Sequence, residues 1–180
     1  MPIQTEAQFT EVYRAHYEDL LRFVRRRAHP MNVDDIVGET FLTAWRRRSE
    51  LPEDPRPWLF RTARNAMLNA NRGMRRRSAL VVYIQQSPDT AAARVTPDVS
   101  HQVDSRLELG AAWQELAAAD QEVLALHVWE ELSARDAAKV LGCTRAAYAM
   151  RLTRAKRRLA ARLTTDTTDT TVSPALALTR

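Results

Sequence analysis

Residues 132–159, LSARDAAKVLGCTRAAYAMRLTRAKRRL, decide the fold of the carboxy-terminal part of the chain. Ser133 followed three residues later by Asp136 is a pattern that opens a helix, and Gly142 is typical of a residue that ends one. Thr144 is then placed to cap a longer, basic helix. This succession is the outline of a helix-turn-helix, whose second helix enters the DNA major groove. Helical hairpins unrelated to DNA share the outline.

The longer helix is predicted to run to about Leu163, and its apolar spacing separates two faces. Tyr148, Leu152, Ala155 and Leu159 recur at helical intervals, so we expect them to pack inward. The opposite face then points outward, and its few hydrogen-bonding groups leave room for apolar contacts with thymine methyl groups. The candidate DNA contacts on the outward face are Thr144, Arg145, Ala149, Met150, Thr153 and Arg154.

The first 77 residues predict three further helices. Thr5 with Gln8 forms a capping-box pattern ahead of an apolar stripe, and Asn32 is placed to cap the second helix. Pro57 suits the first turn of the third helix, which is predicted to end near residue 77. No strand pattern of useful length occurs apart from an ambiguous run, LVVYI, at residues 80–84. The sequence therefore predicts an all-α fold.

The third helix carries a functional signal. Residues 57–77, PWLFRTARNAMLNANRGMRRR, contain no acidic residue, although a solvated helix face more often mixes acids with bases. Arginine and asparagine on one face are suited to phosphates and base edges, and an exposed tryptophan offers a stacking surface for an unpaired base. The candidate contacts are Trp58, Arg61, Asn65, Asn69 and Arg72. The alternative is a plain basic helix with Trp58 in the core.

Charge and composition divide the chain into two blocks. The net charge is +5 over residues 1–77, −2 over 78–104, +3 over 105–163 and −1 over 164–180. The acidic stretch has prolines and small polar residues without sustained apolar periodicity, which is typical of a linker. The threonine-rich end has little to bury, so we expect it to be disordered. The predicted organisation is two small helical domains, 1–77 and 106–163, a flexible linker, 78–105, and a tail, 164–180.

Composition also excludes several classes of protein. Of the 180 residues, 45% are hydrophobic and 27% are charged, and no run approaches the roughly 18 apolar residues of a membrane span. The first residues lack a basic and then apolar leader, so we expect a cytoplasmic protein. One cysteine and four scattered histidines give no metal-ligand spacing, so we expect neither a metal nor a cofactor. Only two of the 27 basic residues are lysine, and arginine is the better match for phosphate oxygens and base edges.

Two motifs in this order resemble the extracytoplasmic-function class of sigma factors, the small two-domain initiation factors of bacterial RNA polymerase. The first is DDIVGETFLTAW at 34–45 followed by the acid-free stretch 57–77, and the second is the stretch 132–159. The resemblance covers roughly residues 5–77 and 106–163. It implies a protein that binds core RNA polymerase and directs it to promoters, melting DNA without catalysing a covalent reaction.

The resemblance also implies roles for individual residues. Asp35, Glu39 and Thr40, expected to face outward, would dock on the clamp of the polymerase beta-prime subunit. The candidate contacts of the third helix would hold the melted −10 element of promoter DNA, and those of the final helix would read the −35 duplex. An anti-sigma partner covering both domains is implied as well, although no residue identifies one.

Some positions depart from the family pattern. Gly38 stands where the family usually has glutamine, Leu116-Ala117 where Leu-Pro is usual, and Ala147 and Ala149 where threonine and a basic residue are common. The promoter sequence therefore cannot be carried over from relatives. One rival is a helix-turn-helix regulator that acts without polymerase, although no segment suggests a dimerisation or ligand domain. A nucleic-acid enzyme is disfavoured because the chain shows neither a carboxylate cluster nor a glycine-rich phosphate loop.

Overall fold

The computed structural model describes residues 3, 5–74 and 99–169, and its regular elements within these ranges are all helices. The amino-terminal block contains α1 (Glu6–Arg25), α2 (Val33–Arg46) and α3 (Arg56–Met74), with short 3-10 turns at Pro30–Asn32 and Arg48–Glu50. The carboxy-terminal block contains α4 (Val99–Gln114), α5 (Ala118–Val128), α6 (Ala134–Leu141) and α7 (Arg145–Asp169). The predicted all-α fold is confirmed.

The start of α1 follows from its capping residues. The Thr5 hydroxyl accepts a hydrogen bond from the Gln8 backbone N–H at 3.2 Å, and the Gln8 side chain accepts one from the Thr5 N–H at 3.1 Å. These reciprocal bonds satisfy two backbone donors that no helical carbonyl can reach, which confirms the predicted capping box. Asn32 precedes α2 as predicted, but its side chain makes no capping bond.

The helix-turn-helix outline is confirmed residue by residue. The Ser133 hydroxyl accepts from the Asp136 N–H at 3.1 Å and opens α6. Gly142 ends α6 with φ +66°, a left-handed conformation that glycine adopts without the clash of a Cβ atom. The Thr144 hydroxyl accepts from the Ala147 N–H at 3.1 Å and opens α7.

Two helices extend beyond the ranges expected for them. Helix α4 begins at Val99, within the predicted linker, and α7 continues to Asp169, past the predicted end of the ordered chain. Helix α5 begins at Ala118 after Ala117, and the Asp120 carboxylate in its first turn pairs with Arg158 of α7 at 2.6 Å. The remaining predicted linker and tail residues, 75–98 and 170–180, and the LVVYI run lie outside the described residues.

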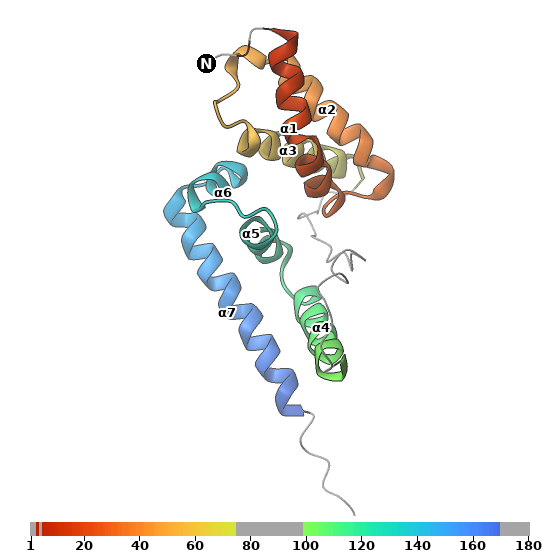
Figure 1. The fold of residues 1–180 in the computed structure, drawn as a ribbon. Coiled ribbons are helices and arrows are strands. Elements are labelled where there is room, and N and C mark those ends of the chain that lie inside the picture. Colours follow the sequence, from red (N-terminus) through yellow and green to blue (C-terminus); the bar gives the residue numbers. More distant parts are fainter. Residues whose placement is uncertain (1–2, 4, 75–98, 170–180) are drawn as a thin grey trace, which may run out of the picture.

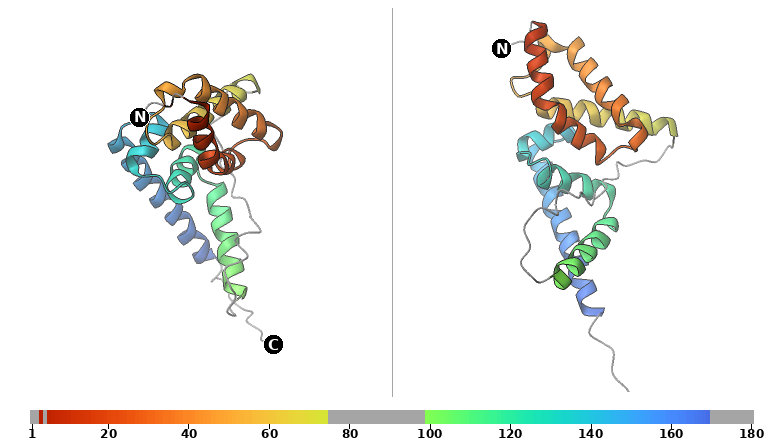
Figure 2. Two further views of the ribbon diagram at one scale, coloured as in Figure 1. Left: turned by 45° about the horizontal axis from the view of Figure 1, so that its top comes forward. Right: turned by 45° about the vertical axis from the view of Figure 1, so that its right-hand side comes forward.

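The two blocks pack against each other. Helix α3 packs against α6 and reaches α5 through Arg64, whereas α4 and α7 extend away from the amino-terminal block (Figures 1 and 2). One hydrophobic cluster runs through both blocks, from Phe23 and Phe60 to Leu126, Val140 and Tyr148. Helix α5 is central: its residues 121–126 are all buried. None of the described helices is long and apolar enough to cross a membrane.

Candidate nucleic-acid interface

The two faces of α7 are oriented as the sequence predicts. Tyr148 and Ala155 are buried, while Leu152 and Leu159 are half-buried against the core. The Tyr148 hydroxyl donates to the carbonyl of Val123 at 3.4 Å, and burial raises the pKa of this phenol to about 12. The buried stripe fixes the rotation of α7, so all six candidate residues of the outward face are exposed: Thr144, Arg145, Ala149, Met150, Thr153 and Arg154.

Helix α3 exposes most of its candidate face. Arg61, Asn65 and Asn69 are exposed, because Leu59 and Met67 bury the opposite side. Trp58 is half-buried and packs against the core, so both readings of this residue are partly right. The side chain of Arg72, in the last turn, lies outside the described residues.

Helix α2 exposes two of its three candidate residues. Asp35 and Glu39 are exposed, as predicted. The predicted outward orientation of Thr40 is wrong: its exposed fraction is 0%, and its hydroxyl donates to the Ile36 carbonyl at 2.7 Å. A threonine hydroxyl in a helix can donate its hydrogen bond to a carbonyl of the preceding turn, so a threonine side chain can be buried without losing this bond.

Arg64 is the residue that the sequence analysis missed. It faces α5, where its Nε atom lies 2.6 Å from Glu122 Oε1 and its Nη2 atom 3.0 Å from Glu122 Oε2. This is the two-pronged guanidinium–carboxylate geometry, which is the strong form of this contact. The sequence indicated Arg64 only through its place next to Asn65 in an acid-free helix. It does not share the helical spacing of the arginine and asparagine face, so that spacing did not include it.

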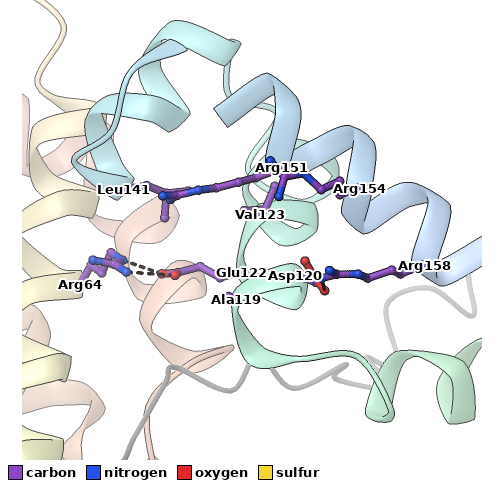
Figure 3. A pocket seen from close by; sticks show the side chains of 9 residues that line it. All are labelled: Arg64, Ala119, Asp120, Glu122, Val123, Leu141, Arg151, Arg154 and Arg158. Atoms are coloured by element: carbon purple, nitrogen blue, oxygen red, sulfur yellow. Dashed lines mark hydrogen bonds and ion pairs between the residues drawn. The ribbon is translucent and has the colours of Figure 1, made fainter. Parts of the chain in front are cut away.

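Arg64 also lines a cavity of about 280 Å³ between α3, α5 and α7. Figure 3 shows Arg151, Arg154 and Arg158 projecting from α7 toward this space, with Asp120 and Glu122 projecting from α5. Four guanidinium groups face two carboxylates, so the lining has a positive balance that favours anions. The structure therefore brings Arg154, a candidate DNA contact on α7, to the same cavity as an arginine of α3.

Family models match both blocks. The model for sigma-70 region 2 matches residues 12–77, and the model for sigma-70 region 4 matches residues 106–159. The first match covers the helices that expose Asp35, Glu39 and Asn65. The second covers the helix-turn-helix and most of α7.

Full-length relatives and solved structures agree with these matches. The chain is 32% identical over 164 residues to the RNA polymerase sigma factor NccH of Alcaligenes xylosoxydans xylosoxydans, covering 86% of each chain. It is 34% identical over 143 residues to the RNA polymerase sigma factor CnrH of Cupriavidus metallidurans, covering 75% of each. The fold is similar to that of CnrH in complex with the cytosolic domain of CnrY (TM-score 0.59, 24% identity, 90% of this chain and 91% of that chain). It is also similar to that of RpoE in complex with the anti-sigma factor NepR from Bartonella quintana (TM-score 0.62, 21% identity, 88% of this chain and 98% of that chain).

Proposed function

Since this chain belongs to the extracytoplasmic-function sigma factors of RNA polymerase, a family that acts in promoter-specific transcription initiation, we propose how its surfaces divide that work. Helix α2 docks on the clamp of the beta-prime subunit of core polymerase. Helix α3 holds the melted −10 strand, and α7 enters the major groove of the −35 duplex. The observation that carries the proposal is the presence on one chain of two exposed basic helix faces, one acid-free and one in a helix-turn-helix.

The α3 face suits single-stranded DNA. Arginine binds the phosphates of the strand, and an asparagine amide offers a donor and an acceptor to one base edge. The exposed part of Trp58 provides a surface on which an extruded base can stack, at the amino-terminal end of the same helix. Stacking contributes about 1–3 kcal/mol per base, which offsets much of the few kcal/mol needed to unstack a base from the duplex.

The α7 face suits duplex DNA but reads few bases by hydrogen bonds. The Thr153 hydroxyl already donates to the Ala149 carbonyl at 3.0 Å, so its remaining capacity is as an acceptor. Met150 has an exposed fraction of 58% and offers an apolar surface to thymine methyl groups. Arg154 is then the main donor to base edges, and Arg145 is placed for the phosphate backbone.

The α2 face suits a basic partner helix. Asp35, Glu39 and Leu42 lie four and three residues apart, so they form one stripe along the exposed side of the helix. Leu42 has an exposed fraction of 48% and places an apolar surface beside these two carboxylates. Two carboxylates beside one apolar contact match an amphipathic helix that carries basic residues.

We extend three further properties of the family to this chain. Its partners are core RNA polymerase, promoter DNA and an anti-sigma factor, as NepR is for RpoE. Its activity is regulatory and not enzymatic. Its place of action is the cytoplasm, where polymerase and promoters are found.

Two experiments test the proposal. A pull-down with purified core polymerase separates the proposal from the rival, a regulator that acts without polymerase. Retention on core is expected, and a failure to bind core contradicts the proposal.

The second experiment compares Asn65→Ala with wild type in forming open complexes on a mapped promoter. Because Asn65 is exposed and lies on the α3 face, at least a tenfold loss of open complexes is expected, about 1.4 kcal/mol, with unchanged affinity for core.

Arg14→Ala is the matched control for the second experiment, since Arg14 is an exposed residue of α1 on neither DNA-binding face. Equal loss of core binding and open complexes in Asn65→Ala indicates misfolding and excludes a role specific to melted DNA.

A further inference from the structure

The cavity between α3, α5 and α7 gathers charged side chains that the function proposed above does not use together. We propose that this cavity binds a small phosphate dianion, either free inorganic phosphate or the terminal phosphate of a metabolite. Binding of the dianion is independent of the proposed function. Only its effect on promoter DNA, described below, rests on that function.

Three arginines of α7 form one wall of the cavity. Arg151, Arg154 and Arg158 lie three and four residues apart, so they share one face of the helix. Figure 3 shows their side chains reaching toward the cavity. Like charges at this spacing repel each other. An anion bound here would relieve that repulsion.

Two of these arginines are available to a ligand. Arg158 Nη1 donates to Asp120 Oδ2 at 2.6 Å. Within the part of the chain that the structure describes, neither Arg151 nor Arg154 forms an ion pair with a carboxylate. Both side chains are exposed, so a ligand reaches them without displacing a protein group.

Arg64 forms the opposite wall, from α3. Its Nε and Nη2 atoms lie 2.6 and 3.0 Å from the two oxygens of Glu122. A guanidinium has more N–H donors than one carboxylate occupies in this geometry, so Arg64 keeps donors for a second acceptor. Glu122 is thus a positioning residue, because it fixes the plane of the guanidinium that faces the ligand.

The charge of the lining indicates the class of anion. Four guanidinium groups and two carboxylates leave a balance of two positive charges. A phosphate monoester carries a charge of about −1.5 to −2 near pH 7, whereas a phosphodiester of DNA carries a single negative charge. A dianion neutralises the lining and a diester does not. The cavity therefore favours a terminal phosphate over an internal phosphate of a nucleic acid.

The size of the cavity limits what else is recognised. Its volume of about 280 Å³ is at the lower end of small-molecule sites, which occupy about 300–1,000 Å³. The uncharged residues of the lining are Ala119, Val123 and Leu141, and they bring no polar side chain to a sugar or a base. Recognition therefore depends on the phosphate group, which matches the planar fork of arginine.

A ligand in the cavity competes with promoter DNA for one residue. In the function proposed above, Arg154 is the main donor that α7 presents to base edges. A dianion held between α3 and α7 engages the same guanidinium, because Arg154 also lines the cavity. Occupation of the cavity is therefore expected to lower the affinity of the chain for −35 duplex DNA.

An NMR titration of the isotope-labelled full chain tests the site without DNA or polymerase. The probes are inorganic phosphate, methyl phosphate and dimethyl phosphate, added at neutral pH and constant ionic strength. We expect saturable shifts of the lining arginine N–H signals with the first two probes. Dimethyl phosphate carries a single charge, so we expect it to bind about tenfold more weakly. AMP separates the two sources: tighter binding than phosphate identifies the terminal phosphate of a nucleotide, and equal or weaker binding identifies free phosphate.

Arg151→Gln tests the wall of α7 in the same titration. The side chain is exposed and has no carboxylate partner among the described residues, so the fold is expected to be unaffected. Phosphate binding is expected to weaken about tenfold, the effect of one charge-assisted hydrogen bond. Arg157→Gln is the matched control, since it makes the same charge change at an exposed position of α7 outside the lining, and a much smaller effect is expected.

Three results would overturn the site: no saturable binding of phosphate, equally tight binding of dimethyl phosphate, or an equal loss of affinity in the two variants.

The effect on DNA is measured by titrating −35 duplex DNA in phosphate and in sodium chloride of the same ionic strength. We expect weaker binding in phosphate, with a smaller difference between the salts for Arg151→Gln. Equal affinity in the two salts overturns the competition and leaves the phosphate site in place. Failure of the chain to bind core polymerase would contradict the proposed function and leave the phosphate titration unaffected.

Discussion

At the scale of single residues, similar arginines have different surroundings. Arg27 is buried against Glu130, Arg64 is paired across the two blocks, and Arg154 is exposed beside a cavity. The sequence indicates only that all three are basic. Their partners lie far away along the chain, and no local pattern connects Arg27 with a carboxylate 103 residues further on. These contacts were therefore beyond prediction, whereas the exposed residues of α7 followed directly from helical spacing.

Arg154→Ala tests the role of α7 at this scale. The substitution removes the main donor that the outward face presents to base edges, so affinity for −35 duplex DNA is expected to fall by about 1–3 kcal/mol. The measurement is a titration of duplex DNA carrying the upstream half of a mapped promoter. Arg14→Ala removes the same charge from α1. Equal loss of affinity for the duplex in both variants would mean that Arg154 acts only through the net charge of the protein.

At the scale of elements, residues with a specific backbone or capping role were predictable. Thr5, Ser133 and Thr144 begin their helices as predicted, and Gly142 ends α6. Each of these roles depends only on neighbours within four residues, so it can be predicted from the local sequence. Thr40 shows the limit of such reasoning, because an exposed or a buried threonine can follow from the same helical pattern.

Two glycines give opposite predictions at this scale. Gly142→Ala is expected to destabilise the protein by about 1–2 kcal/mol, since a left-handed φ of +66° brings an alanine Cβ close to its own backbone. Gly38→Ala is expected to stabilise it by about 0.5–1 kcal/mol, since Gly38 lies in an exposed part of α2 with nothing within 4 Å of an added Cβ. Urea unfolding measures both. Effects of the same sign in the two variants would contradict the assigned backbone roles.

At the scale of the whole molecule, the sequence predicts two blocks, and the structure joins them through one hydrophobic cluster. Composition revealed the blocks because acidic and basic segments alternate along the chain. It could not reveal their contact, which depends on apolar side chains of α5 and α6 that equally well form a domain core of their own. The family matches cover the two blocks separately, so the domain boundaries at 77, 105 and 163 remain a prediction.

Glu130→Gln tests the coupling of the blocks. Wild type is expected to unfold in one calorimetric transition because its core is continuous. Removing one partner of a buried ion pair lowers the free energy of unfolding by about 3–5 kcal/mol, because the other charge stays buried without a partner. Separation of the two blocks returns that charge to water and removes the penalty. Glu130→Gln is thus expected to unfold in two transitions.

Glu131→Gln is the control for that experiment, because Glu131 is the exposed neighbour and undergoes the same charge change. Two separate transitions already present in wild type would contradict the coupling, as would a single unshifted transition in Glu130→Gln.

Run-off transcription tests the central claim most directly: this chain directs core RNA polymerase to promoters through α3 and α7. Purified core polymerase and the chain are incubated with genomic DNA fragments, and the starts of the transcripts are mapped. We expect transcripts that require both proteins and begin at fixed positions downstream of two shared sequence elements. Sequence-specific DNA binding by the chain alone, without any polymerase-dependent transcript, would contradict the account.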